Sequence, residues 1–145
     1  MALISIERSS PLPSDEVWRR LTRWERHAAH VPLTRIVVTT PPPTRPGTVF
    51  VARTGVGPVG FDDPMEVVRW EPPTPGGTGR CRLEKHGTLV LGWAEIEVSA
   101  HGTGSRVTWH EELRVRGLPR LFDGLTARSG RLMFGRAITG LLAEA

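Results

Sequence analysis

The sequence predicts an α+β fold in which an antiparallel sheet of about seven strands packs on a long C-terminal helix. Three observations support this prediction. Segments of strand character follow one another from residue 33 to residue 115, separated by turns rich in glycine and proline. Residues 118–145 then change to an apolar repeat of helical period. Finally, a chain of 145 residues suits one domain, spanning residues 1–145, around one core.

Each element is expected from its local pattern. Residues 3–8 alternate as a first strand, and a proline-rich turn leads into a helix that starts near Ser14 and buries an aromatic face. A second short helix is expected over residues 25–30, because Pro32 follows it. The other strands are expected over residues 33–40, 48–54, 65–70, 80–86, 89–100 and 106–115. Consecutive hairpins make such a sheet antiparallel, and only the final helix is long enough to cover it.

Composition argues against several function classes. No apolar run reaches the roughly 18 residues of a membrane span, and no secretory signal is visible, so a cytoplasmic protein is expected. The single cysteine, Cys81, excludes an internal disulfide and a cysteine-cluster metal site. The net charge of +4 comes from 18 arginines and one lysine, Lys85, scattered among 15 acidic residues. Nucleic-acid binding is therefore not expected, because such binders gather their charge on one face.

Cofactor and metal motifs are weak. Residues 55–60 match G-x-G-x-x-G, but strand-like residues follow them where a dinucleotide site needs a helix, so a hairpin turn is predicted. The acidic residues within 62–66 are also interpreted as a turn, with too few ligands for calcium. His27 and His30 stand three residues apart, and no third metal ligand stands out. We expect neither a metal nor an organic cofactor.

Three stretches together resemble proteins of the helix-grip superfamily. This superfamily, also called SRPBCC, includes START domains, Bet v 1-like proteins and polyketide cyclase/dehydrase proteins. The stretches are residues 6–18, with a proline-containing turn before Val17-Trp18, residues 69–73 (Arg-Trp-Glu-Pro-Pro) and residues 106–113. Their order, over nearly the whole chain, carries the likeness. The resemblance implies a curved sheet that grips the long helix and leaves a cavity for a polyketide, a lipid or an aromatic metabolite.

Strand parity selects candidate cavity residues. The face shared by Trp109, Glu111 and Leu113 is apolar except for Glu111, which is therefore expected inside. In the strand over residues 65–70 alternation does not settle the inner face, but the resemblance favours Arg69 inside, because aromatase/cyclases of this kind carry a pocket arginine near that point. The expected ligand contacts lie beside these groups or on the C-terminal stripe: Trp109, Met65, Val67, Leu113, Leu125 and Phe122.

Arg69 and Glu111 have two open interpretations. As catalytic residues, Arg69 polarises a ligand oxygen and Glu111, perturbed by burial, moves a proton. As structural residues, they form an ion pair or reach the cavity mouth. The sequence thus predicts a domain that binds a small hydrophobic molecule and leaves polyketide cyclase or aromatase activity open. A non-catalytic carrier or sensor, and a regulatory module with a filled core, are the alternatives, and the oligomeric state is undetermined.

Overall fold

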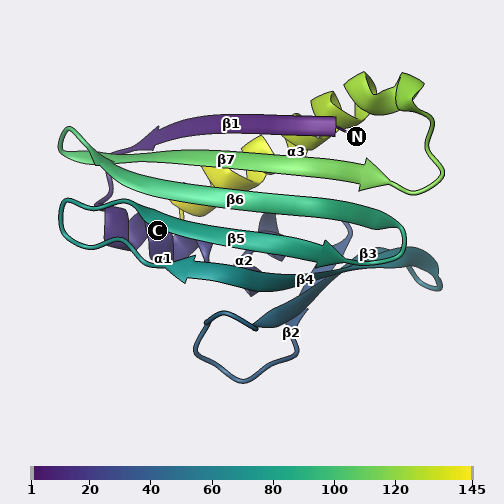
Figure 1. Cartoon of the computed structure of the whole chain (residues 1–145), viewed down its shortest axis with the longest axis horizontal. Helices are drawn as coiled ribbons and strands as arrows, with labels where there is room; N and C mark the ends of the chain where they lie inside the picture. Colours follow the sequence, from purple (N-terminus) through teal and green to yellow (C-terminus); the bar gives the residue numbers. More distant parts are fainter. Residues whose placement is uncertain (1, 145) are drawn as a thin grey trace.

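Seven strands form one antiparallel sheet in the computed structural model, which describes residues 2–144 (Figure 1). The strands are β1 (Ala2–Ser10), β2 (Thr34–Val38), β3 (Val49–Val56), β4 (Val59–Glu71), β5 (Gly79–His86), β6 (Val90–His101) and β7 (Gly104–Val115). The helices are α1 (Ser14–Leu21), α2 (Trp24–His27) and α3 (Asp123–Leu142), with 3₁₀ turns η1 (Ala28–His30) and η2 (Arg120–Phe122). The sheet order is β1-β7-β6-β5-β4-β3-β2. The α+β helix-grip class is thus confirmed.

The core lies between the inner face of the sheet and the helices. Strand β1 alternates as expected, with Ile4 and Ile6 buried between exposed neighbours. Helix α1 is amphipathic and turns Val17, Trp18 and Leu21 inward. In Figure 1 the later part of α3 passes behind β1 and β7, whereas its first turns project beyond the end of β1. The helix therefore covers the sheet only along its C-terminal part.

Close approach of α3 to its neighbours depends on glycines. A Cβ atom added to Gly130 would lie 2.4 Å from Ile4 Cδ1 of β1, and one added to Gly140 would lie 2.3 Å from His30 Nδ1 of η1. Both positions therefore leave room for a neighbouring side chain, at the helix-propensity cost of about 1 kcal/mol that glycine carries relative to alanine. None of the helices described within residues 2–144 is long and apolar enough to cross a membrane.

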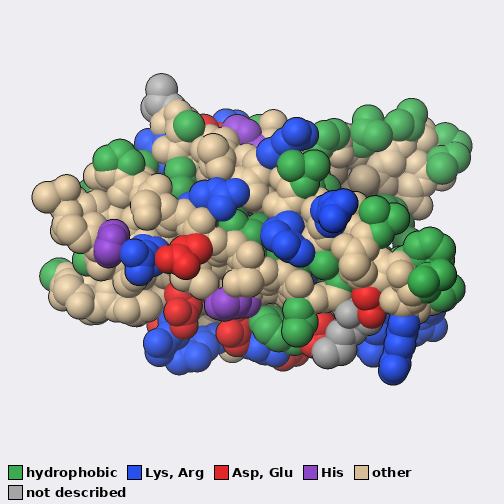
Figure 2. All heavy atoms as spheres, turned by 90° about the horizontal axis from the view of Figure 1, so that it is seen from above, with side chains coloured by type: hydrophobic (Ala, Val, Ile, Leu, Met, Phe, Trp, Pro, Cys, Tyr) green, Lys and Arg blue, Asp and Glu red, His purple; other side chains and the backbone are tan. Residues whose placement is uncertain are grey.

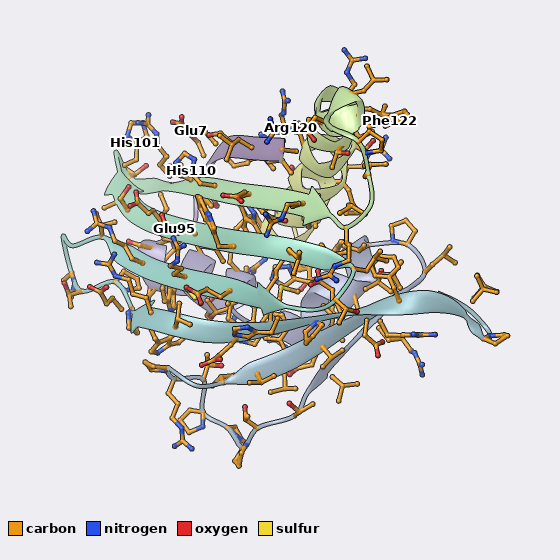
Figure 3. The ribbon with its side chains drawn as sticks, turned by 45° about the vertical axis from the view of Figure 1, so that its right-hand side comes forward. Glu7, Glu95, His101, His110, Arg120 and Phe122 are labelled. Carbon is orange, nitrogen blue, oxygen red and sulfur yellow. The ribbon has the colours of Figure 1, made fainter. Side chains whose placement is uncertain are left out.

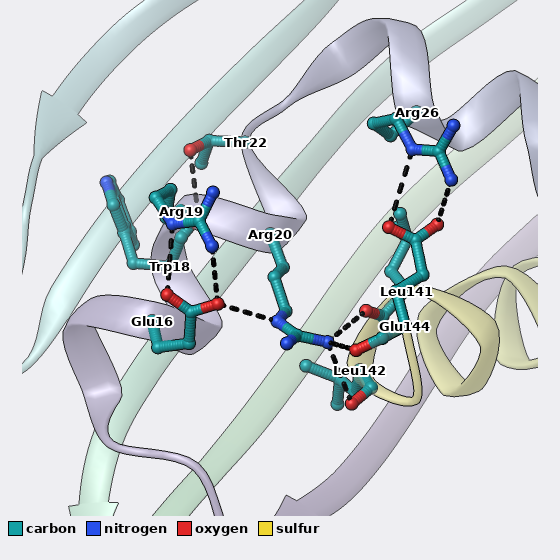
Figure 4. A network of polar contacts seen from close by, with 9 residues as sticks. All are labelled: Glu16, Trp18, Arg19, Arg20, Thr22, Arg26, Leu141, Leu142 and Glu144. Atoms are coloured by element: carbon teal, nitrogen blue, oxygen red, sulfur yellow. Dashed lines mark hydrogen bonds and ion pairs between the residues drawn. The ribbon is translucent and has the colours of Figure 1, made fainter.

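A polar network fastens α1 and α2 to the end of α3 (Figure 4). Arg20 is held by the Glu16 carboxylate, 2.8 Å from its Nε, and its Nη1 donates to three main-chain oxygens at the end of α3. The acceptors are the carbonyl groups of Leu141, Leu142 and Glu144. The Glu144 carboxylate lies 2.7 Å from both Arg26 Nη2 and His30 Nε2, and these hydrogen bonds lower its pKa to about 2. The orphan carbonyls of the helix end are thus satisfied.

The hairpin of β3 and β4 is longer than the sequence pattern predicts. Its turn lies at Gly57 and Pro58, where Gly57 adopts a φ of 57°, and pairing begins again at Val59. Asp62 and Asp63, expected in a turn, therefore lie within β4 opposite β3. Both carboxylates have cationic partners in the sheet, which explains why the ladder continues through two residues of low strand propensity.

Candidate functional site

A pocket of about 270 Å³ lies between the inner face of the sheet, α2 and α3. Much of its lining is aromatic. Trp24 of α2 stacks on Phe50 of β3 with ring centroids 4.7 Å apart, and Trp109 of β7 stacks on Phe134 of α3 at 6.0 Å. These rings come from four different elements, so the tertiary fold assembles a wall of flat apolar surfaces.

One wall of the pocket carries a buried cluster of charged side chains. Lys85 Nζ, on β5, donates to Asp63 Oδ2 of β4 at 2.8 Å and lies 3.8 Å from Glu111 Oε2 of β7. The side chains of Lys85, Asp63 and Glu111 are 3%, 13% and 1% exposed. Trp109 Nε1 donates to the other oxygen of Glu111 at 3.1 Å. All four residues line the pocket.

The strand between Lys85 and Glu111 makes their approach possible. Strand β6 lies between β5 and β7, and its residues opposite the cluster are Gly92, paired with Lys85, and Ala94, paired with Glu111. Neither residue carries a side chain longer than a methyl group. The ammonium group can therefore reach across β6 to a carboxylate two strands away.

The cluster has one cation for two carboxylates. Burial raises the pKa of Glu111, although the charge of Lys85 and the Trp109 hydrogen bond oppose this. Burial also disfavours the Lys85 ammonium, but Glu111 and Asp63 outweigh it and raise the pKa of Lys85. Asp63 Oδ1 and Glu111 Oε2 are buried without a hydrogen-bond partner among the described residues. The pocket wall thus holds two carboxylate oxygens that accept no hydrogen bond from the described residues, although Lys85 lies near one of them, and this arrangement favours a ligand with hydrogen-bond donors.

His27 completes the aromatic lining. Its ring lies 6.0 Å from Trp24 and 6.1 Å from Trp109, measured between centroids. His27 Nε2 lies 2.7 Å from the main-chain oxygen of Leu21, so Nε2 carries the proton and donates to it, which leaves Nδ1 as an acceptor in the neutral ring. Burial lowers the pKa of His27. The neutral imidazole therefore serves as a third flat ring beside the two tryptophans.

Protonation of His27 is expected to make stability depend on pH. The folded-state pKa is below the ordinary value of 6.5, so the unfolded chain binds the extra proton first. The contribution of neutral His27 to the free energy of unfolding should therefore be complete above pH 6.5. It should decrease as the pH drops towards the lowered pKa, by up to ~1.4 kcal/mol per pH unit. Urea unfolding between about pH 5 and 8 should show this slope reduced in His27→Gln. The control His110→Gln should keep the wild-type pH dependence of the free energy of unfolding. The same pH dependence in both variants would contradict a neutral His27.

The structure places four of the predicted site residues together. Trp109, Glu111, Leu113 and Met65 all line the pocket, and strand parity suggested the three residues of β7. Val67 is fully buried in the core and is not part of the pocket wall. On the opposite, outer face of the same strands, His110 and Glu95 point away from the helices (Figure 3). Alternation along β7 therefore assigns the inner face correctly.

The structure corrects the expected position of Arg69. The pairing of β4 with β5 shifts by one residue between Val67 and Arg69, which is a β-bulge. Val67 remains inside, but Arg69 is exposed and its Nε donates to Glu71 Oε2 on the outer face. Trp70 turns inward instead and packs on Trp18 at 5.1 Å between ring centroids. Arg69 therefore does not face the cavity, because the bulge reverses the alternation on which that expectation depended.

Phe122 and Leu125 also lie outside the pocket. They are 40% and 62% exposed, Phe122 at the end of η2 and Leu125 in the first turn of α3, where the helix projects past the sheet. The apolar residues predicted to form one stripe divide between two faces of α3: Ile138 and Leu141 are buried, whereas Leu125 and Leu132 lie on the opposite, exposed face. Helix α3 itself begins at Asp123, after a turn at Gly117, which adopts a φ of 82°. The prediction of these two residues as ligand contacts is thus not supported by their placement.

The sequence interpretation missed Lys85, Asp63, Trp24 and His27 as pocket residues. A signal for Lys85 was present, because Cys81, Leu83 and Lys85 share one face of β5 and the first two are apolar. Asp63 cannot be found in this way, because the sequence pattern predicts a turn over its segment. The polar partner of Glu111 is consequently Lys85, the single lysine of the chain, and not Arg69.

The acidic residues 62–66 do not converge on a metal site. Asp62 pairs with Arg53 at 3.3 Å, Asp63 pairs with Lys85, and Glu66 lies 3.0 Å from His86 Nε2. Each therefore has its own cationic or imidazole partner. Within residues 2–144 no group of three or more His, Cys, Asp or Glu side chains is placed to hold a metal ion.

Comparison with known proteins connects the chain to solved structures alone. Sequence searches match neither a family model nor a curated protein. TTHA0849 from Thermus thermophilus is 16% identical, with a TM-score of 0.68 over 97% of this chain and 93% of that one. Ara h 8.0201 is 13% identical, with a TM-score of 0.66 over 98% of each chain. The ZhuI aromatase/cyclase from Streptomyces sp. R1128 is 12% identical, with a TM-score of 0.64 over 97% and 90%. At such identities the likeness shows a shared fold only.

Proposed function

We propose that this chain, which has the Bet v 1-like helix-grip fold, binds a small, flat and mostly apolar molecule in the pocket between its sheet and α3. The observation that carries the proposal is a wall of aromatic rings, with Trp24 and Trp109 among them, beside two buried carboxylate oxygens that accept no hydrogen bond within residues 2–144. Apolar rings hold the body of the ligand and the carboxylates accept its polar hydrogens.

The size and polarity of the pocket narrow the ligand class. Its volume of about 270 Å³ lies near the lower end of ligand pockets, which span about 300–1,000 Å³. A long acyl chain does not fit such a space, whereas a fused-ring aromatic metabolite does. The unpaired oxygens of Asp63 and Glu111 select a hydroxyl or amine group on that ligand, because an ether or a carbonyl has no proton to give them.

Binding of 2-naphthol provides the test. This probe is flat and carries one hydroxyl donor, and 2-methoxynaphthalene is a probe of similar shape without it. Titration calorimetry should show that the wild-type protein binds 2-naphthol at least about tenfold more tightly than it binds 2-methoxynaphthalene. The reason is that a hydrogen bond to a charged group contributes about 1.5–3 kcal/mol. Native mass spectrometry of freshly purified protein should in addition show a co-purifying aromatic compound.

Filling the pocket should weaken this binding. Ala137 of α3 is buried and lines the pocket, so Ala137→Phe places a ring where the ligand lies. We expect its affinity for 2-naphthol to fall by at least about tenfold. Ala143→Phe, on an exposed residue beyond α3, is the matched control, and Arg69→Ala should bind as the wild type does. Undiminished binding by a folded Ala137→Phe protein would reject the pocket as the site.

Proton transfer, as in polyketide cyclisation or aromatisation, is a second candidate function. Glu111 has a raised pKa and an unpaired oxygen at the pocket, and Lys85 lies beside it to stabilise an enolate oxygen. In this scheme Glu111 accepts the proton from the carbon next to a ketone and later returns it. Exchange of the C1 protons of 2-tetralone in heavy water, followed by NMR, should then be faster with the protein. Glu111→Gln should slow this exchange by about 10²-fold or more. If the wild-type protein does not accelerate the exchange, proton transfer is rejected and only the proposal of ligand binding remains.

A further inference from the structure

Exposed apolar side chains lie on two elements, on α3 with the segment before it and at the turn of the β3–β4 hairpin. Met133 of α3 is 37% exposed and also lines the pocket, so the pocket reaches the surface beside this helix. The first group comprises the residues that lead into α3 and its exposed face: Leu118, Leu121, Phe122, Leu125 and Leu132. In the second group Val56 and Val59, at the turn of the β3–β4 hairpin, are 65% and 76% exposed. We call these residues the rim.

Both parts of the rim lie at one end of the molecule. Figures 1 and 3 show the first turns of α3 and the β3–β4 turn at the same end, and Figure 3 labels Arg120 and Phe122 there. Figure 2, which views the molecule from above, shows hydrophobic side chains gathered at that end. Leu121 is 85% exposed and Leu125 is 62% exposed. Exposed apolar side chains gathered at one end of a molecule mark an interaction site.

Arginines accompany the apolar rim. Residues 114–136 contain six arginines and a single acidic residue, Asp123. All six arginines are exposed, and one carboxylate cannot neutralise them, so this segment keeps a strong positive charge. On α3, Leu125, Arg128 and Leu132 follow at spacings of three and four residues and so share one helix face. A partner must therefore offer both an apolar layer and negative charge.

We propose that this surface docks the protein on an anionic lipid bilayer. The rim leucines enter the boundary between headgroups and acyl chains, and the arginines pair with lipid phosphates. A second copy of the chain is disfavoured as partner, because a symmetric contact would bring the six arginines of each copy together. The two parts of the rim project from separate elements at one end of the molecule, a shape that suits a deformable plane. Docked in this way, the pocket opens towards the membrane, and an apolar ligand passes between them without crossing water.

Vesicle binding tests the proposal without any ligand for the pocket. Co-sedimentation should compare vesicles of phosphatidylcholine alone with vesicles that contain phosphatidylglycerol as well. We expect the protein to sediment with the anionic vesicles in low salt and to be released as salt rises, because screening weakens the arginine contacts. Equal binding to both compositions, or no binding to either, would overturn the proposal.

Surface variants separate the two contributions. Arg128→Ser/Arg131→Ser should weaken binding to anionic vesicles roughly 25-fold, since each arginine near the surface contributes about a fivefold factor. Leu121→Ser/Leu125→Ser should weaken it by at least about tenfold, through loss of inserted apolar area. Arg45→Ser and Val37→Ser change similarly exposed residues on or beside β2, away from the rim, and should bind as the wild type does.

Two further results distinguish the occupant of the surface. All variants should keep 2-naphthol affinity, so vesicle binding and the proposed ligand binding can fail independently. Analytical ultracentrifugation should find the protein at the same mass before and after the leucine substitutions. A dimer that dissociates in Leu121→Ser/Leu125→Ser would assign the rim to a second copy, and vesicle binding unchanged in that variant would equally refute membrane docking. Selective binding of an acidic protein in place of vesicles would overturn it as well.

Discussion

Replacing Lys85 by methionine is expected to lower the free energy of unfolding by about 3–5 kcal/mol at about pH 7. Lys85 is the only cation beside the buried carboxylates of Asp63 and Glu111, at 2.8 and 3.8 Å, among the described residues. Methionine keeps the length of the side chain and packs on Met65, whose sulfur already lies 3.6 Å from Lys85 Nζ. The loss therefore measures uncompensated buried charge and not a cavity. Urea unfolding followed by tryptophan fluorescence provides the measurement.

A control and a rescue make this result specific. Arg80→Met removes an exposed ion pair from the same strand, where Arg80 Nε lies 3.0 Å from Glu97, and should change the unfolding free energy by only about 0–1 kcal/mol. The triple variant Lys85→Met/Asp63→Asn/Glu111→Gln removes all three charges and should regain most of the stability. A single Lys85→Met variant within about 1 kcal/mol of the wild type would show that the cluster is not electrostatically coupled.

Gly92→Ala is expected to cost about 3 kcal/mol of stability. Gly92 has a φ of 131°, and a Cβ atom there would lie 1.9 Å from the main-chain oxygen of Glu112 in the paired strand β7. That oxygen belongs to backbone within the ladder, so it cannot yield as a flexible side chain does. Gly92 also pairs with Lys85 on its other side. A shift of β7 therefore moves Glu111 relative to Lys85, and 2-naphthol affinity should decline together with stability.

Gly102→Ala is the matched control for this substitution. Gly102 also has a positive φ, 61°, but a Cβ atom there meets nothing within 4 Å. Its expected loss is the backbone cost alone, about 1–2 kcal/mol. The difference between the two variants in denaturant unfolding isolates the contact with β7. If both lose the same amount, the close approach of β6 to β7 has no energetic consequence at this position.

Much of the site was accessible from alternation alone, and its errors have identifiable physical origins. Trp109, Glu111 and Leu113 of β7 were placed correctly because that strand pairs regularly along its length. Arg69 was misplaced because β4 carries a bulge, and an inserted residue exchanges inner and outer faces beyond it. Leu125 was misplaced for another reason: it lies on the face of α3 opposite Ile138 and Leu141, so the broad apolar stripe combined a buried face with an exposed one.

The sequence by itself determined the element types, the antiparallel order of consecutive hairpins and the inward position of Glu111. These follow from local periodicity and from the cost of burying unpaired backbone. Only the tertiary structure decided the partner of Glu111, because Lys85 and Asp63 reach it from two other strands past the small residues Gly92 and Ala94. It also decided which apolar residues of the C-terminal segment enter the core and which remain exposed. Contacts of this kind depend on strand register and helix position, which no single stretch of sequence records.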